Sequence, residues 1–225
     1  MKKKIVLFGT GKIADVIHYQ MTHDGDFEVA AATVDREYIT TDHFHGAPVV
    51  PFEEIEEKYP PSEYGMFVAL GYQSMNDLRA AKVATAREMG YELVTFVHPE
   101  SGMPACTELG DNCFVMNNVA IQPWVKLGHN VFVFSGAMIG HHSSIGDNCW
   151  VTSTANISGV VTAGQNCFFA TSSTVAHEVK LGDRCFLGAN SLVTKDLADG
   201  SVVIQKSTDV QRLNSDQFLK MSRFT

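Results

Sequence analysis

Cysteine is scarce in this sequence and follows none of the patterns that give it a structural role. There are five cysteines, an odd number, and no two of them form a Cys-x-x-Cys pair. Small secreted domains rely on paired cysteines, and zinc ribbons need closely spaced pairs, so both classes fit the chain poorly. We therefore expect a reduced protein without a metal site.

Long apolar runs are also missing. Three lysines at the N-terminus precede the run Ile5–Phe8, which resembles the start of a secretory signal. The run is shorter than the roughly 7–15 apolar residues that such a signal needs. No segment approaches the roughly 18 apolar residues of a membrane helix. We expect a cytoplasmic protein with no membrane partner.

Basic charge is low. Lysine and arginine number 17 against 25 acidic residues, which gives a formal net charge of -8. Nucleic acids are bound through basic surfaces that neutralise phosphates, so a nucleic-acid partner is not expected. The 45% hydrophobic and 19% charged content is typical of a folded globular chain. A length of 225 residues allows one large domain or two modest ones.

The N-terminal region begins with a strand, a glycine turn and a helix. The apolar run Ile5–Phe8 leads into Gly9-Thr10-Gly11, and Ile13–Met21 has helical character. A second apolar strand, Val29–Val34, ends at Asp35. This order is typical of a nucleotide-binding βαβ unit, in which glycines let a phosphate approach a helix N-terminus and the acid binds ribose or base. The alternative is that the glycines only form a tight turn.

Further strands and helices alternate up to about residue 96. Met66–Leu70 followed by Gly71 is a predicted strand, residues 76–89 are a predicted helix that ends near Gly90, and Leu93–Val97 completes the unit. This alternation predicts a Rossmann-like α/β domain with a parallel sheet over residues 1–96. The region is short for a full dinucleotide fold, which argues against NAD, and Lys12 lacks the spacing of a P-loop.

From Leu109 onward the sequence repeats every six residues. The sixth-residue positions are all apolar: Leu109, Val115, Ile121, Leu127, Val133, Ile139, Ile145, Val151, Ile157, Ala163, Phe169, Val175, Leu181, Leu187 and Val193. Four residues after each of the first fourteen lies a small residue, Cys, Val, Ala or Ser. A column of large residues beside a column of small ones is what the inside of a triangular solenoid requires, so the repeat predicts a β-helix over residues 97–200.

A longer period of 18 residues is superimposed on the hexads. The text Gly110-Asp111-Asn112-Cys113 nearly recurs at Gly146-Asp147-Asn148-Cys149 and at Gly182-Asp183-Arg184-Cys185. Three short strands per coil give about five coils, stacked roughly 4.8 Å apart. Cysteines at 149, 167 and 185 then stack inside the solenoid as small apolar filler, with a soft-metal site or a disulfide as the alternative.

At these hexads the sequence resembles the hexapeptide-repeat acyltransferases. The arrangement is similar to the branch with sialic-acid O-acetyltransferase-like enzymes and UDP-amino-sugar N-acetyltransferases of bacterial surface-glycan synthesis. The resemblance implies a left-handed β-helix, acetyl-CoA as acyl donor, and a homotrimer with the CoA groove between subunits. It also implies that the N-terminal domain binds a nucleotide sugar, at positions matched here by Gly9, Gly11, Lys12, Asp35, Leu70 and Gly71.

The resemblance places the catalytic base at His141. The family motif His-(Asp/Glu)-x-x-Ile-Gly matches the segment from His141 to Gly146, but His142 stands where the family has an acid. The segment that begins His177-Glu178 keeps the acid and lies two coils later, close to the C-terminal end of the helix. We favour His141; the alternative is a corner histidine without a catalytic role.

A neutral imidazole can accept the proton that a sugar amine or hydroxyl loses as it attacks a thioester. Gly159 lies 18 residues after His141, one coil away, and its backbone N–H is the expected oxyanion donor. The resemblance further implies that Gly188 and Ala189 line the pantetheine and nucleotide ends of CoA. The alternative for these glycines is a role in turning the coil.

Acetylation of a nucleotide-linked amino sugar at nitrogen is the function we favour, with O-acetylation of a sialic-acid-like sugar second. A γ-carbonic-anhydrase-like zinc site on His141 and His177 needs a third ligand, and the expected position holds Gly182. A non-catalytic β-helix protein is the remaining alternative. The C-terminal tail, residues 201–225, leaves the repeat; its apolar residues Phe218, Leu219, Met221 and Phe224 are expected either to cover the open end of the coil or to pack on a neighbouring subunit.

Overall fold

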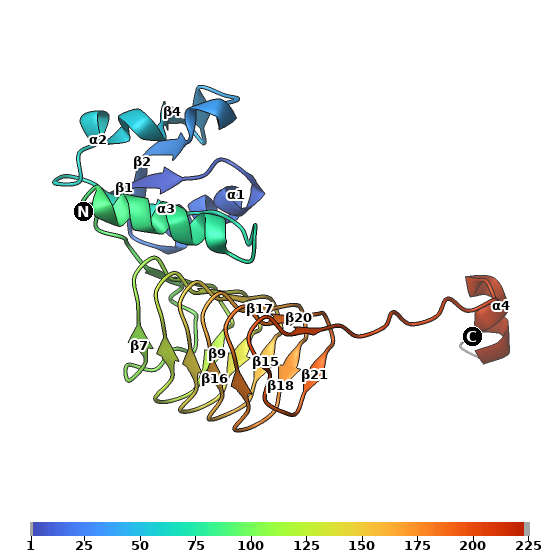
Figure 1. Cartoon of the computed structure of the whole chain (residues 1–225). Helices are drawn as coiled ribbons and strands as arrows, with labels where there is room; N and C mark the ends of the chain where they lie inside the picture. Colours follow the sequence, from blue (N-terminus) through green and yellow to red (C-terminus); the bar gives the residue numbers. More distant parts are fainter. Residues whose placement is uncertain (1, 223–225) are drawn as a thin grey trace.

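The computed structural model describes residues 2–222, in which a small α/β layer lies over a three-sided β-helix (Figure 1). The elements of the N-terminal domain are β1 (Lys3–Phe8), α1 (Lys12–Tyr19), a π-helical turn (Gln20–Asp24), β2 (Phe27–Val34), a 3-10 turn (Arg36–Tyr38), β3 (His43–Phe44), β4 (Ala47–Pro51), a 3-10 turn (Phe52–Glu54), α2 (Ile55–Lys58), β5 (Gly65–Val68) and α3 (Asp77–Glu88).

The N-terminal sheet has the order β3-β4-β2-β1-β5. Strands β1, β2, β4 and β5 run parallel, as the alternating pattern predicts. The edge strand β3 is antiparallel to β4, which the sequence analysis did not anticipate. It follows from the tight turn at His45 and Gly46, both with positive φ, because such turns match the twist of a hairpin. Residues Ile5–Phe8 of β1 and the whole of β5, which ends the sheet, are buried on both faces.

The β-helix consists of two-residue strands in three parallel sheets. The first sheet contains β7 (Glu108–Leu109), β10 (Lys126–Leu127), β13 (Ser144–Ile145), β16 (Thr162–Ala163) and β19 (Lys180–Leu181). The second, which we call the aromatic sheet, contains β6 (Phe96–Val97), β8 (Phe114–Val115), β11 (Phe132–Val133), β14 (Trp150–Val151), β17 (Phe168–Phe169), β20 (Phe186–Leu187) and β22 (Val202–Val203). The third contains β9 (Ala120–Ile121), β12 (Met138–Ile139), β15 (Asn156–Ile157), β18 (Thr174–Val175) and β21 (Leu192–Val193).

The predicted repeat is confirmed strand by strand. Residues 18 apart pair in neighbouring coils, as Leu127 does with Ile145 and Ile139 with Ile157. The large hexad residues and the small column form one continuous core. The five cysteines are free thiols, and four of them lie in this core. Burial raises the pKa of Cys113 to about 12, which keeps that thiol neutral, as expected of apolar filler.

The N-terminal domain packs on the aromatic sheet. The first residue of each two-residue strand points out of the coil and is exposed or half-buried on the other two sheets. In β8, β11, β14 and β17 of the aromatic sheet it is Phe114, Phe132, Trp150 or Phe168, and each of these is buried. They share a hydrophobic cluster with Ile17 of α1 and with other residues of the N-terminal sheet. The outward aromatic residues therefore determine which face of the solenoid the first domain covers.

Asparagines at one corner of the coil join the β-helix to the N-terminal domain by hydrogen bonds. The side-chain amides of Asn112, Asn130, Asn148 and Asn166 bond from coil to coil at 2.8–3.1 Å. All four have positive φ, which asparagine tolerates better than most residues. At the two ends of this row, Asn112 accepts a hydrogen bond from the N–H of Val68, and Asn166 donates to the carboxylate of Asp77.

The segment Leu93–Val97 is divided between the N-terminal domain and the β-helix. The prediction that the whole segment completes the N-terminal unit is therefore wrong. Leu93 forms a parallel bridge with Met66 beside β5, whereas β6 pairs with β8 of the aromatic sheet. An outward Phe96 continues the stack of aromatic rings with Phe114, at a centroid distance of 5.4 Å. That stacking favours pairing with the β-helix.

The C-terminal tail does not cover the open end of its own coil. Helix α4 (Ser215–Ser222) lies at the end of an extended segment that leads away from the β-helix (Figure 1). The side chains of Phe218, Leu219 and Met221 are exposed, and Phe224 lies outside the described residues. Among residues 2–222, no helix has the length and apolarity required to cross a membrane.

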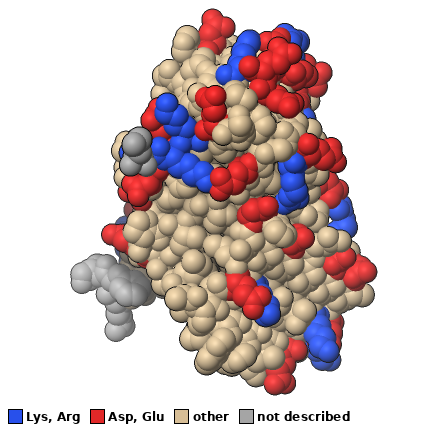
Figure 2. Space-filling view, turned by 90° about the vertical axis from the view of Figure 1, so that its left-hand side faces the viewer, with Lys and Arg blue, Asp and Glu red and all other residues tan. Residues whose placement is uncertain are grey.

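Charge is distributed without a dominant basic surface on the face shown in Figure 2. Acidic and basic side chains alternate over the upper part of this face, and most of the lower part is uncharged. This agrees with the formal net charge of -8.

Candidate active site

The glycine turn after β1 forms one wall of a pocket in the N-terminal domain. Gly9 has a φ of +125°, and a Cβ at this position would lie 2.8 Å from the carbonyl oxygen of Ala69, so glycine is required there. Gly11 is the N-cap of α1, and no atom lies within 4 Å of the position where its Cβ would be. The space beside Gly11 is therefore open to a ligand at the start of the helix.

Two adjoining hollows contain all six residues predicted to bind the nucleotide sugar. One, of about 410 Å³, is lined by Gly11, Lys12, Ile13, Ala14, Ala69, Leu70, Gly71, Tyr72 and Gln73. The other, of about 400 Å³, is lined by Phe8, Gly9, Thr10, Gly11, Val34, Asp35, Glu37, Tyr38, Leu70, Gln73, Leu78 and Lys82. They meet at Gly11, Leu70 and Gln73, so the structure brings the predicted residues together at the carboxyl ends of β1, β2 and β5.

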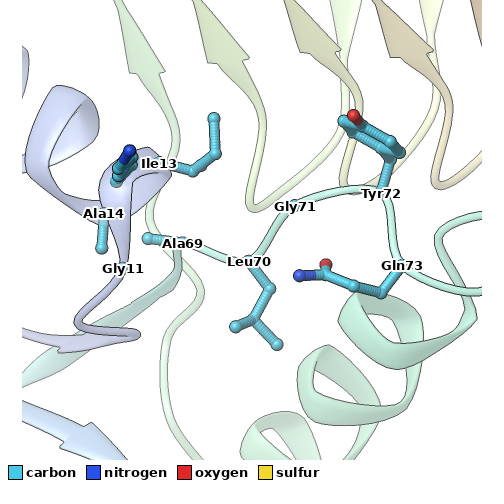
Figure 3. Close-up of a pocket in the computed structure, with 9 residues that line it drawn as sticks. Gly11, Ile13, Ala14, Ala69, Leu70, Gly71, Tyr72 and Gln73 are labelled. Carbon is cyan, nitrogen blue, oxygen red and sulfur yellow. The ribbon is translucent and has the colours of Figure 1, made fainter.

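The segment Ala69–Gln73 runs between the start of α1 and the β-helix. Figure 3 shows the amide of Gln73 turned back toward Leu70, while Tyr72 lies on the side of the β-helix strands. The Tyr72 ring contacts Trp150 and Phe168, at centroid distances of 5.5 and 4.8 Å. This pocket wall is therefore positioned by the aromatic sheet.

A buried arginine holds the same segment. Arg79 of α3 is fully buried and donates hydrogen bonds to the carbonyl oxygens of Gly71, Asn130 and Asn148, at 3.0–3.2 Å. It also donates to the side-chain oxygen of Asn130, at 2.9 Å. Its guanidinium lies 4.4 Å from the centre of the Phe132 ring. Burial lowers the pKa of Arg79 to about 9, so the group is still charged at pH 7.

Sequence reasoning missed Lys82, Gln73 and Tyr72. Lys82 forms an ion pair with Asp35 at 2.5 Å, on the side of the pocket where the acid was expected. No spacing from the glycine turn points to Lys82, because it lies on a helix reached only after four further strands. The available signal is its position in the second turn of α3, the helix that follows β5 and Gly71.

The predicted base lies at the corner between the third and first sheets. This histidine corner consists of Trp124, His141–His142, Gly159–Val160 and His177–Glu178 from successive coils. The backbone N–H of His141 donates to the side-chain oxygen of Gln122 at 2.9 Å. The Nδ1 atoms of His141 and His142 are 3.2 Å apart, and the rings of His141 and His177 lie 6.1 Å apart.

Gly159 provides the space that the His141 ring occupies. A Cβ at residue 159 would lie 2.8 Å from Nε2 of His141 and 2.9 Å from its Cε1. Within residues 2–222, the N–H of Gly159 has no hydrogen-bond acceptor. The backbone of Gly159 therefore lies beside the Nε2 atom of the predicted base, and its N–H is the candidate oxyanion donor.

The structure does not bring Gly188 and Ala189 to His141 within one chain. They follow β20, at the corner between the aromatic and third sheets, whereas His141 lies at the next corner. Gly188 is buried, and a Cβ there would lie 3.0 Å from the carbonyl oxygen of Val203. A glycine is thus also favoured at residue 188 because the last strand, β22, passes close to its backbone. Ala189 is exposed.

Neither histidine lies in a metal-type cluster. His177 faces Glu178, with Nε2 and Oε1 3.4 Å apart, and no salt bridge joins a carboxylate to His141 in the described chain. No group of three or more His, Cys, Asp or Glu side chains within residues 2–222 is arranged to hold a metal ion.

Comparison with known families supports the repeat. The model of the hexapeptide repeat of succinyl-transferase matches residues 100–123, 160–195 and 178–203. No curated protein sequence matches the chain.

Solved structures extend the similarity over both domains. A histidine-to-asparagine variant of perosamine N-acetyltransferase from Caulobacter crescentus, in complex with CoA and GDP-perosamine, is 27% identical with a TM-score of 0.81. The alignment covers 90% of this chain and 93% of the perosamine N-acetyltransferase chain. The acetyltransferase domain of PglB from Neisseria gonorrhoeae, at 20% identity and a TM-score of 0.80, covers 91% of this chain and 97% of its own and shares the fold. Over both domains the chain is thus similar to the hexapeptide-repeat sugar acyltransferases, and this similarity identifies it as an acyltransferase.

Proposed function

We propose that the protein transfers an acetyl group from acetyl-CoA to the amino group of a nucleotide-linked amino sugar, in the synthesis of a bacterial surface glycan. The observation that carries this proposal is the pairing of a glycine-turn pocket in the first domain with an imidazole beside a free N–H on the β-helix. The similarity to an N-acetyltransferase that binds CoA and GDP-perosamine favours nitrogen over oxygen as the acceptor.

The division of labour follows the parts of the chain. Residues 1–96 bind the nucleotide sugar: the N-terminus of α1 faces the phosphates, and Asp35 with Lys82 lies where ribose or base would bind. Residues 97–200 bind acetyl-CoA and carry the catalytic group, with Gly188 and Ala189 along the coenzyme. Residues 201–225 form the tail.

His141 acts as the general base. Acetyl-CoA supplies an activated thioester, and the sugar amine forms the new C–N bond at its carbonyl carbon while the C–S bond breaks. Nε2 of His141 accepts the proton that the amine loses and returns it to the departing thiolate of CoA. The N–H of Gly159 stabilises the carbonyl oxygen when negative charge develops on it. No covalent acyl-enzyme is required.

The active site is shared between two subunits of a homotrimer. In one chain the nucleotide pocket lies against the aromatic sheet, through Tyr72, Trp150 and Phe168. His141 lies between β12 of the third sheet and β13 of the first sheet, at the corner opposite the aromatic sheet. Pocket and base of the same chain therefore face apart, and the nucleotide sugar bound by one subunit must reach the His141 of another.

The function is tested by incubating the purified protein with acetyl-CoA and a panel of UDP-, dTDP- and GDP-linked amino sugars, each beside its hydroxyl analogue. Release of the CoA thiol and the mass increase of one acetyl group are expected only with an amino sugar. Transfer only to a hydroxyl would establish O-acetylation instead. Absence of thiol release with every member of the panel would contradict the proposal.

Subunit sharing predicts complementation between two inactive variants. Gly11→Trp fills the pocket at the N-terminus of α1, and His141→Asn removes the base, so each homo-oligomer is expected to have little activity. Co-expressed and purified through two different tags, mixed oligomers are expected to regain activity, because some sites then combine an intact pocket with an intact base. If the mixture stays as inactive as its parents, pocket and base belong to the same chain.

Gly159→Ala is expected to lower kcat about 10²-fold while the KM values change little. The added Cβ would lie 2.8 Å from Nε2 of His141 and must displace the ring, and a displacement of about 1 Å is sufficient for such a loss. Val160→Ala, at the exposed neighbouring position, is the matched control. Equal kcat values for the two variants would show that Gly159 serves only to turn the coil.

A further inference from the structure

The hydrogen-bond partner of His141 is an imidazole. The Nδ1 atoms of His141 and His142 lie 3.2 Å apart, which is hydrogen-bond distance. One of the two nitrogens must carry the proton and the other must offer its lone pair, because two protonated nitrogens or two lone pairs repel. The bond therefore makes the tautomer of each ring depend on the tautomer of the other.

His142 is held in place independently of His141. Its φ is +58°, at the left-handed position that asparagine often occupies at the other two corners of the coil. Its N–H donates to the carbonyl oxygen of Pro123 at 3.2 Å, and its ring packs on Trp124 with 4.7 Å between centroids. The backbone and the indole thus orient the His142 ring, which gives it the rigidity that a positioning group needs.

The two tautomers differ in what they leave at Nε2 of His141. If His141 donates from Nδ1–H to His142, its Nε2 keeps a lone pair, and that atom faces the backbone of Gly159. If His142 is the donor, Nε2 carries the proton and His141 is not a base. Only the first arrangement is compatible with proton transfer from an amine.

The surroundings contain one other histidine and one carboxylate. His177 lies 6.1 Å from the His141 ring, and Glu178 faces His177 at 3.4 Å. The other members of the histidine corner, Trp124 and Gly159–Val160, have no titratable side chain. No carboxylate contact to His141 is present in residues 2–222, so His142 takes the place of the acid that normally follows this base.

We infer that His142 is a positioning residue: its neutral Nδ1 accepts the hydrogen bond from Nδ1–H of His141 and holds the tautomer whose Nε2 is free to take a proton. This inference rests on the proposed role of His141 as the base. A neutral acceptor orients the imidazole but lends it no negative charge, unlike a carboxylate. The protein thus keeps the geometry of the usual pair without its electrostatic stabilisation of the protonated base.

Three substitutions at residue 142 separate these contributions. Ala removes the acceptor, Asn offers a neutral oxygen, and Asp offers a charged one on the same skeleton; Asn and Asp both tolerate a positive φ. We expect His142→Ala to lower kcat about tenfold with little change in KM, and His142→Asn to restore most of the loss. His142→Asp is expected to restore kcat and to move the acid limb of the pH–kcat profile upward by about one unit, because the carboxylate stabilises the protonated imidazole.

Nitrogen-15 NMR of the histidine-labelled protein reports the tautomer without requiring turnover. The His141 signals are identified by their loss in His141→Asn, and above the titration of His141 they are expected to show Nδ1–H in the parent and Nε2–H in His142→Ala. An Nε2–H tautomer of His141 in the parent protein would overturn the inference. So would a kcat and a pH profile in His142→Ala equal to those of the parent. If the sugar panel finds no acetyl transfer, the NMR result still decides the role of His142 on its own.

Discussion

His141→Asn is expected to lower kcat for acetyl transfer about 10³-fold, because the sugar amine then has no group to accept its proton. Asparagine keeps a polar side chain of similar reach and leaves the Gly159 N–H in place. Binding of acetyl-CoA and of the nucleotide sugar is therefore expected to persist, with KM values close to those of the parent. Continuous detection of the CoA thiol under saturating substrates measures the effect.

The matched control is His177→Asn, two coils further along the same corner. His177 is exposed and faces Glu178, so its loss is expected to change kcat far less than the loss of His141. Unchanged unfolding temperatures would show that neither variant disturbs the coil. A large loss in His177→Asn beside a nearly active His141→Asn would transfer the role of base to His177.

Arg79→Ala is expected to lower the free energy of unfolding by about 3 kcal/mol. The substitution removes four hydrogen bonds and leaves the carbonyl oxygens of Gly71, Asn130 and Asn148 without this donor in a buried position. It also removes the volume that packs on Phe132. The desolvation that lowers the pKa of the arginine opposes this loss, but unpaired buried carbonyls and a cavity outweigh it. Urea unfolding followed by tryptophan fluorescence measures the change, since Trp150 lies at this junction.

Arg87→Ala is the control on the same helix. Arg87 forms a half-exposed bidentate pair with Asp111, and such surface pairs contribute about 0–1 kcal/mol. Because Arg79 also holds Gly71 in the pocket wall, Arg79→Ala is further expected to raise the KM for the nucleotide sugar. Equal unfolding curves for the two variants would show that the junction does not depend on Arg79.

The repeat made the β-helix predictable because a solenoid imposes the same requirement on every coil. Each sixth residue must fill the interior, so a column such as Ile139, Ile145 and Val151 is visible without any knowledge of distant contacts. The N-terminal βαβ order was readable for a similar reason, since Gly9 and Asp35 follow their strands directly. The hairpin strand β3 and the division of Leu93–Val97 were missed, because an isolated two-residue strand outside the repeat leaves almost no periodic signal.

The site was predictable in part. The residues expected to bind the nucleotide sugar do line adjoining hollows, and Gly159 does lie against His141. The partners Lys82, Arg79 and Trp124 were not foreseen. Each is brought to the site by packing between segments far apart in the sequence, and no local spacing records such a contact.

The amino-acid sequence by itself determined the coil, its period and the side chains at each corner, because these follow from which residues a repeating unit must bury. Only the tertiary structure decided which face the N-terminal domain covers, and hence that the pocket and His141 of one chain point apart. It also placed the Nδ1 atom of His142 3.2 Å from that of His141, at the position where the family motif has an acid. The physical reason is that interior filling is a property of each residue and its period, whereas hydrogen bonds and domain packing depend on where distant side chains meet.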